Sequence, residues 1–259
     1  MDDTTNTSLL AVTLFAGILL AMEGGRRLAI FVLTRDTERD VKGAGPAEGA
    51  VLGLLGLLVA FTFSGAASRF EDRKHLITQE TNAIGTAYLR IDLLNEEQRA
   101  PMRELFRRYL DSRLETYRSA SDPAAVEKNL AASVVLQNEI WRQSVSGVQV
   151  PGAAPQAGML LLPALNEMID ITTTRIAAAR NHPPAVVFYM LGVLSLVGAL
   201  LTGYSMAGNK SRSWLHQIVF ATMMSATLYV VLDLEYPRRG LIRVDAADQL
   251  LVELRQSMN

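Results

Sequence analysis

The chain has 259 residues, of which 49% are hydrophobic and 20% are charged, and its formal net charge is −1. This near-neutral balance provides no basic field for nucleic acid, so we expect no nucleic-acid partner. The chain contains no cysteine, which excludes disulfides and thiol chemistry, and its three histidines lie far apart without metal-ligand spacing.

The first predicted element is an apolar helix over residues 8–22, which can continue to residue 33. A secretory signal peptide needs a basic segment before its apolar run and a cleavage site of small residues after it. Here Asp2 and Asp3 precede the run, and the sequence from Glu23 to Arg27 follows it. We therefore predict a retained membrane helix that ends at an interface anchored by arginines.

A second apolar run covers residues 47–67, after a glycine- and proline-containing break at 43–46, and predicts a second membrane helix. Small side chains recur along it at helical spacing and let helix backbones approach closely in lipid. The partner of this face is either another helix of the same chain or a second subunit, and a narrow pore wall is the remaining interpretation. The small residues are Gly49, Gly53, Gly56, Ala60 and Ser64.

Residues 69–182 are charged and helix-patterned, so they predict an extramembrane helical domain. Asn95 is a candidate N-cap, and Asp122 followed by Pro123 is another helix start. The most distinctive polar stretch covers residues 80–92. It is either an ordinary solvated helix or, repeated by each subunit, a ring of polar groups at a pore mouth. The candidates for that mouth are Glu80, Asn82, Thr86 and Arg90.

Two further uncharged runs, residues 184–204 and 214–232, predict a transmembrane hairpin. The fold class is therefore an all-α integral membrane protein with four transmembrane helices and a helical soluble domain inserted between helices two and three. The predicted parts are residues 1–68 for the first two helices, 69–182 for the domain, 183–234 for the last two helices and 235–259 for a C-terminal tail.

Charged residues close the fourth helix, and they have two interpretations. They either anchor the helix at the lipid interface or form a gate in which a carboxylate pairs with an arginine. The gate is considered because an acidic group so close to hydrocarbon is costly unless it is paired or hydrated. The carboxylate candidates are Asp233 and Glu235, and the arginine candidates are Arg90, Arg238 and Arg239.

Motifs of enzymatic chemistry are missing from the sequence. It contains no glycine-rich phosphate loop, no Ser/His/Asp cluster and no HExxH motif. We therefore predict that the protein is not an enzyme and uses no cofactor and no metal.

Several segments resemble the bestrophin-like family of bacterial membrane proteins, and the resemblance spans nearly the whole chain. They are residues 51–64, 67–70, 80–90 and 233–240. One departure is Tyr236, where the family pattern has a basic residue before Pro237, which removes a salt bridge from that position. Bestrophins are pentameric anion channels with four membrane helices per subunit and a helical soluble part. The resemblance therefore implies a pentameric homo-oligomer in the bacterial inner membrane.

Lysines and arginines in the short links predict an orientation. The positive-inside rule places both links in the cytoplasm, and the N-terminus, helical domain and tail outside. The resemblance implies the opposite, because bestrophins keep their helical domain and termini in the cytoplasm. The basic residues counted are Arg26, Arg27, Arg35, Arg39 and Lys42 after the first helix, and Lys210 and Arg212 between the last two.

These patterns favour an oligomeric ion channel whose pore is lined by the second helix and its polar extension. Its partners would be membrane lipid, inorganic ions and further copies of the chain, because a subunit with so few membrane helices encloses a pore most easily in a ring. The alternative is a membrane-anchored sensory or scaffolding protein whose helical domain binds a ligand or partner. A transporter is the third reading, but the glycine and proline interruptions of the two halves do not correspond.

Overall fold

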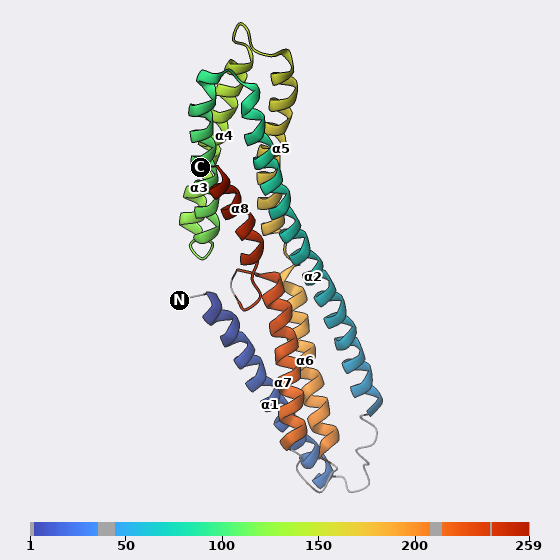
Figure 1. The fold of residues 1–259 in the computed structure, drawn as a ribbon. Helices are drawn as coiled ribbons and strands as arrows, with labels where there is room; N and C mark the ends of the chain where they lie inside the picture. The colour runs from blue at the N-terminus through green and yellow to red at the C-terminus, as the bar shows by residue number, and fades with distance from the viewer. Residues whose placement is uncertain (1–2, 36–44, 208–213, 239, 259) are drawn as a thin grey trace. The chain divides into compact units, whose positions relative to one another are not determined.

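The computed structural model is all-helical over the residues that it describes, which are 3–35, 45–207, 214–238 and 240–258. Figure 1 shows the order of these elements along the chain. The helices are α1 (Asp3–Arg35), α2 (Gly45–Leu89), the short 3₁₀ helix η2 (Arg90–Leu93), α3 (Glu96–Arg118), α4 (Pro123–Val148), α5 (Pro155–Arg180), α6 (Ala185–Met206), α7 (Trp214–Glu235) and α8 (Asp245–Ser257).

The chain divides into two compact units. Unit 1 comprises residues 1–68 and 182–241, and unit 2 comprises residues 69–181 and 242–259. The 45-residue helix α2 contributes to both units, because the division falls after Ser68 in its middle. Each unit has a core of its own.

In the part of the chain that the structure describes, four stretches of helix are long and apolar enough to cross a membrane. They are Ser8–Val32, Gly45–Leu93, Pro155–Met206 and Trp214–Glu235. The all-helical fold and the four candidate spans confirm that part of the predicted fold class. The location of the helical domain outside the membrane stays a prediction.

The first helix is longer than the predicted core of residues 8–22. It continues through Glu23 to Arg35 without a break, so the arginines do not mark its end. The helix continues here because its charges pair within one turn: Arg26 and Arg27 donate to the carboxylate of Glu23 at 3.0 and 2.9 Å. Three arginines that we assign to the link from the sequence, Arg26, Arg27 and Arg35, lie inside α1 instead.

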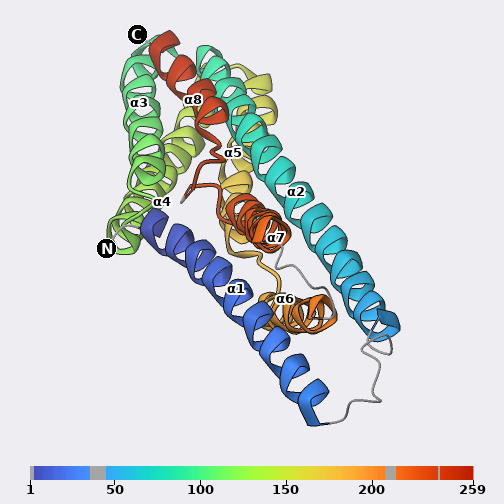
Figure 2. The ribbon, with the colours of Figure 1, turned by 90° about the horizontal axis from the view of Figure 1, so that it is seen from below.

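Helices α6 and α7 lie between α1 and the first half of α2 in unit 1 (Figure 2). On one side, the α1 residues Ile18 and Met22 pack with small residues of α6 and α7. On the other side, Leu55 of α2 packs with Leu191 of α6 and Leu228 of α7. The buried partners differ on the two sides: they are Ala199 and Ala221 on the α1 side, and Leu191 and Leu228 on the α2 side.

Two glycines bring the backbones of α1 and α6 into direct contact. A Cβ atom added to Gly25 would overlap the carbonyl oxygen of Leu200, and one added to Gly203 would overlap the carbonyl oxygen of Met22. Such contacts allow the close backbone approach by which helices associate in lipid. The small-residue packing predicted from sequence lies on the second helix and does not include this pair.

Unit 2 is built around the second half of α2, with α3, α4, α5 and α8. Its largest fully buried apolar side chains include Phe106 and Leu110 of α3, Ile140 of α4 and Ile84 of α2. The predicted start of α4 is confirmed, because the Asp122 carboxylate accepts hydrogen bonds from the backbone of the first turn.

The C-terminal segment is part of the unit 2 core. Leu251 of α8 is fully buried there, and Met258 lies in the same cluster. The carbonyl of Met258 accepts hydrogen bonds from Tyr88 and Arg107. The sequence predicted that residues 245–255 are amphipathic, but it did not predict that the apolar face packs into the core of unit 2.

The contact between α1 and α6 generates a prediction. We expect Gly25→Ala and Gly203→Ala each to destabilise unit 1 by about 1–3 kcal/mol, because the added methyl group meets backbone that cannot rotate away. Gly24→Ala and Gly192→Ala are matched controls, since an added Cβ meets nothing within 4 Å at either position. Unfolding in a denaturing detergent measures the difference, and equal stability of all four variants would contradict the contact.

Candidate functional site

The small residues of α2 form a face that packs on no described helix of the same chain. Gly49, Gly53 and Gly56 are exposed, and an added Cβ would meet nothing within 4 Å at any of them. Ala60 and Ser64 on the same face are exposed as well. Of the three interpretations, contact with a second subunit and a pore wall both need such an open face.

The other sides of the same segment have different chemistry. Leu52, Leu55 and Val59 pack toward α6 and α7, about 120° around the helix axis from the small residues. Leu54 and Phe61 form a third, exposed side of large apolar groups, which suits contact with lipid. One turn of α2 therefore offers a packed side, an apolar side and a small-residue side.

The part of α2 in unit 2 also has an exposed stripe, and its side chains are polar. Glu71, His75, Gln79 and Asn82 are exposed at helical spacing, and Thr86 follows half-buried. These residues are three to four positions apart, as the small residues from Gly49 to Ser64 are, and both sets fall on the same side of the helix. A series of outward positions therefore runs along nearly all of α2.

Three basic residues, two in this segment and one directly after it, are held by neighbouring groups. Arg73 donates to the carbonyls of Ala178 and Asn181 at the C-terminus of α5, where helix carbonyls lack partners. Lys74 pairs with Glu71. Arg90, predicted at the pore mouth, donates to the carbonyl of Leu160 at 2.5 Å.

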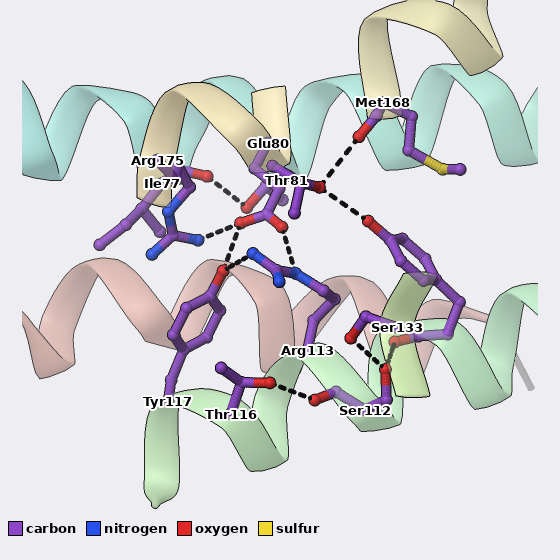
Figure 3. A network of polar contacts seen from close by, with 12 residues as sticks. Ile77, Glu80, Thr81, Ser112, Arg113, Thr116, Tyr117, Ser133, Met168 and Arg175 are labelled. Carbon is purple, nitrogen blue, oxygen red and sulfur yellow. Dashed lines mark hydrogen bonds and ion pairs between the residues drawn. The ribbon is translucent and has the colours of Figure 1, made fainter. Parts of the chain in front are cut away.

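Glu80, predicted at the same mouth as Asn82 and Thr86, lies in the interior of unit 2 with 0% exposure. Its Oε1 accepts a hydrogen bond of 2.7 Å from Nε of Arg113. Its Oε2 accepts from the Tyr117 hydroxyl at 2.8 Å and from Nη1 of Arg175. Figure 3 shows the carboxylate between these three side chains, which come from α3 and α5.

The tyrosine ring lies against both guanidinium groups, which completes the cluster of Glu80, Arg113, Tyr117 and Arg175, here called the Glu80 cluster. The Arg175 guanidinium carbon is 4.1 Å from the Tyr117 ring centroid, and that of Arg113 is 5.1 Å away. Tyr117 also accepts a hydrogen bond from Nη2 of Arg113. Each of the four side chains thus contacts at least two of the others.

Burial and charge act together on the ionisation of this cluster. Burial, then the Glu80 carboxylate, raises the pKa of Tyr117 far above its usual range. Burial alone would lower the pKa of Arg113, but Tyr117 and Glu80 favour its charged form and the net effect is a raised pKa. The tyrosine therefore stays neutral and the arginine stays charged.

A second, uncharged network lies beside this cluster. The Tyr109 hydroxyl, the Thr172 hydroxyl and the Gln137 amide hydrogen-bond one another at 3.0–3.2 Å. Ser112 and Ser133 share a hydrogen bond of 2.6 Å between α3 and α4. These polar groups are satisfied inside the helical unit, as buried polar groups must be.

The end of α7 holds the carboxylates that were considered for a gate. Glu235 is fully buried, and its Oε1 lies 2.8 Å from Nδ1 of His182, whose ring stacks on Tyr236. The carboxylate of Asp233 accepts from the backbone N–H of Leu241 at 3.0 Å. Arg238 is half-buried, and Arg239 lies outside the described residues.

His182 is the partner that the sequence analysis did not assign to Glu235. The two residues are 53 positions apart, and only the fold brings them together. An added Cβ at Gly240 would overlap the Asp233 carboxylate, so the two residues lie against each other in the turn after α7. Within the described part of the chain, no group of three or more His, Asp or Glu is placed to hold a metal ion.

Comparison with known proteins places these features in a family. A bestrophin-like domain matches residues 32–248. The fold is similar to the crystal structure of a single-substitution variant of a bacterial bestrophin homolog from Klebsiella pneumoniae, with a TM-score of 0.68 and 13% sequence identity. That match covers 96% of each chain. No curated protein matches the sequence.

The Glu80 cluster generates a prediction. We expect Glu80→Gln to destabilise unit 2 by about 3–5 kcal/mol, because it leaves buried arginines without their counter-charge. Glu139→Gln is the control, since Glu139 pairs with the exposed Arg142 on the surface of α4. Denaturant unfolding followed by Trp141, in a Trp214→Phe background, measures both, and equal midpoints would contradict the assigned role.

Proposed function

The chain belongs to the bestrophin-like family, and on that premise we propose that it is the subunit of an oligomeric ion channel whose pore is lined by α2. The observation that carries the proposal is the outward series of small and then polar residues along this helix. A pore wall needs side chains that leave room for an ion in the membrane and contact water beyond it. Both properties occur on this series.

The small number of candidate spans and the open face of α2 also support the proposal. The described residues contain four candidate spans, and the small-residue face of α2 is turned away from all of the described helices. A subunit with so few spans encloses a pore most easily in a closed ring of copies. We propose a homo-oligomer in the bacterial inner membrane, with the pentamer taken from the family resemblance, and with lipid and inorganic ions as its other partners.

The individual residues take different roles in this proposal. Gly49, Gly53, Gly56, Ala60 and Ser64 would line the pore or the contact with the next subunit. Asn82 and Thr86 would stand at the pore mouth. Glu80 and Arg90, which are bonded inside unit 2, would position α2 rather than meet the ion. Asp233, Glu235 and Arg238 would anchor or gate the end of α7.

The proposal predicts the effect of bulk on the small-residue face. We expect Gly53→Leu and Gly56→Leu each to abolish ring assembly or unitary currents, because a leucine fills the space that the glycines leave open. Leu54→Phe is the matched control, since it adds bulk to the exposed apolar side of the same turn. Size-exclusion chromatography and planar-bilayer recording in asymmetric salt measure the two properties.

Several outcomes would contradict that assignment. Unchanged oligomer size and currents in both glycine variants would remove the small-residue face from the pore and from the interface. Silent bilayers from a monodisperse wild-type oligomer would instead count against conduction itself and favour the sensory or scaffolding role.

We propose the orientation that the short basic links predict, with the helical unit and the C-terminus outside the cytoplasm. An alkaline phosphatase fused to the C-terminus is then active, because the enzyme folds in the oxidising periplasm. A green fluorescent protein fused at the same position should stay dark. The reverse pair of signals would establish the cytoplasmic placement that the family resemblance implies.

A further inference from the structure

The Glu80 cluster contains more positive than negative charge. The guanidinium groups of Arg113 and Arg175 share the single carboxylate of Glu80, which leaves an excess of one positive charge. Tyr117 does not compensate it, because the raised pKa keeps its phenol neutral. Burial likewise raises the pKa of Tyr109. Glu80 is the carboxylate that acts on both tyrosines and on Arg113.

This excess charge is enclosed by the helical unit. The side chains of Glu80, Arg113 and Arg175 are 0%, 1% and 9% exposed. A buried charge without a counter-charge is expensive, because water that would otherwise solvate it is excluded. The Glu80 cluster therefore lacks a counter-charge for one of its two arginines.

One nitrogen of Arg113 is also left without an acceptor. Its Nε donates to Glu80 and its Nη2 donates to Tyr117. Its Nη1 is buried and has no hydrogen-bond partner in the described part of the chain. A buried donor needs an acceptor, and none of the described residues supplies one.

We propose that a small monovalent anion, of which chloride is the representative, binds at Nη1 of Arg113 and neutralises the Glu80 cluster. A water molecule could accept the hydrogen bonds but would leave the excess charge. A divalent anion would overcompensate a single positive charge, and a large organic anion would not enter a site with so little exposure. The site supports the helical unit and does not depend on the proposed channel.

The test uses the full chain, purified in detergent with Trp214→Phe, so that Trp141 of α4 reports on unit 2. Thermal unfolding is followed in mixtures of sodium chloride and sodium gluconate at constant ionic strength. An anion bound only by the folded state raises the midpoint progressively as its concentration passes the dissociation constant. We expect chloride and bromide to raise the midpoint above its value in gluconate.

Two variants assign the effect to the cluster. Arg175→Gln removes the excess charge, and its midpoint should no longer depend on chloride. Arg142→Gln is the matched control, because Arg142 is an exposed arginine of the same unit that pairs with Glu139, and it should keep the wild-type dependence. A chloride dependence that persists in Arg175→Gln would overturn the assignment.

A direct measurement on the wild-type protein covers the case in which Arg175→Gln does not fold. Crystals grown with bromide should show an anomalous scattering peak at Nη1 of Arg113. A bromide peak there supports the proposal. A water molecule at that position, or equal unfolding midpoints in chloride and gluconate, would overturn it.

Discussion

The shared carboxylate of Glu80 fixes which side of α2 faces outward in unit 2. It accepts hydrogen bonds from Arg113 and Tyr117 of α3 and from Arg175 of α5, so three helices meet at one side chain. Turning α2 by one residue about its axis would withdraw the carboxylate from two arginines that are themselves buried. With Glu80 turned inward, Asn82 on the same helix remains exposed.

Unit 1 depends on a different physical constraint. Lipid gives helices no hydrophobic reason to associate, so close backbone packing has to hold them. Gly25 and Gly203 supply that contact between α1 and α6, whereas α2 is held through Leu52 and Leu55. The glycines of α2 are therefore not needed to fold the subunit. Their open face is available for a second copy of the chain or for an aqueous path.

Much of the fold could be predicted from local patterns. The apolar runs predicted the four candidate spans, and Asp122 predicted the start of α4, because both depend on neighbours in sequence. The first helix was predicted over residues 8–22 with a continuation to residue 33 left open, and it runs to Arg35. The charges of Glu23, Arg26 and Arg27 look like an interface but pair within the helix.

The candidate site was less accessible to sequence reasoning, because its contacts join distant parts of the chain. Glu80 was singled out for its polarity, yet its burial depends on Arg113 and Arg175, which lie 33 and 95 positions away. The contact of Glu235 with His182 is non-local in the same way. The small-residue stripe could be recognised from spacing alone, but whether a neighbour covers it is a property of the fold.

The central claim is that the small and polar side of α2 lines an aqueous path, and cysteine accessibility tests it most directly. The chain has no native cysteine, so single cysteines can be introduced one at a time. A charged, water-soluble thiosulfonate should block current through channels with cysteine at Gly53, Ala60 or Asn82. It should leave current unchanged with cysteine at Leu54 or Phe61. Block of the channels with cysteine at Leu54 or Phe61, without block of those with cysteine at Gly53, Ala60 or Asn82, would contradict the account.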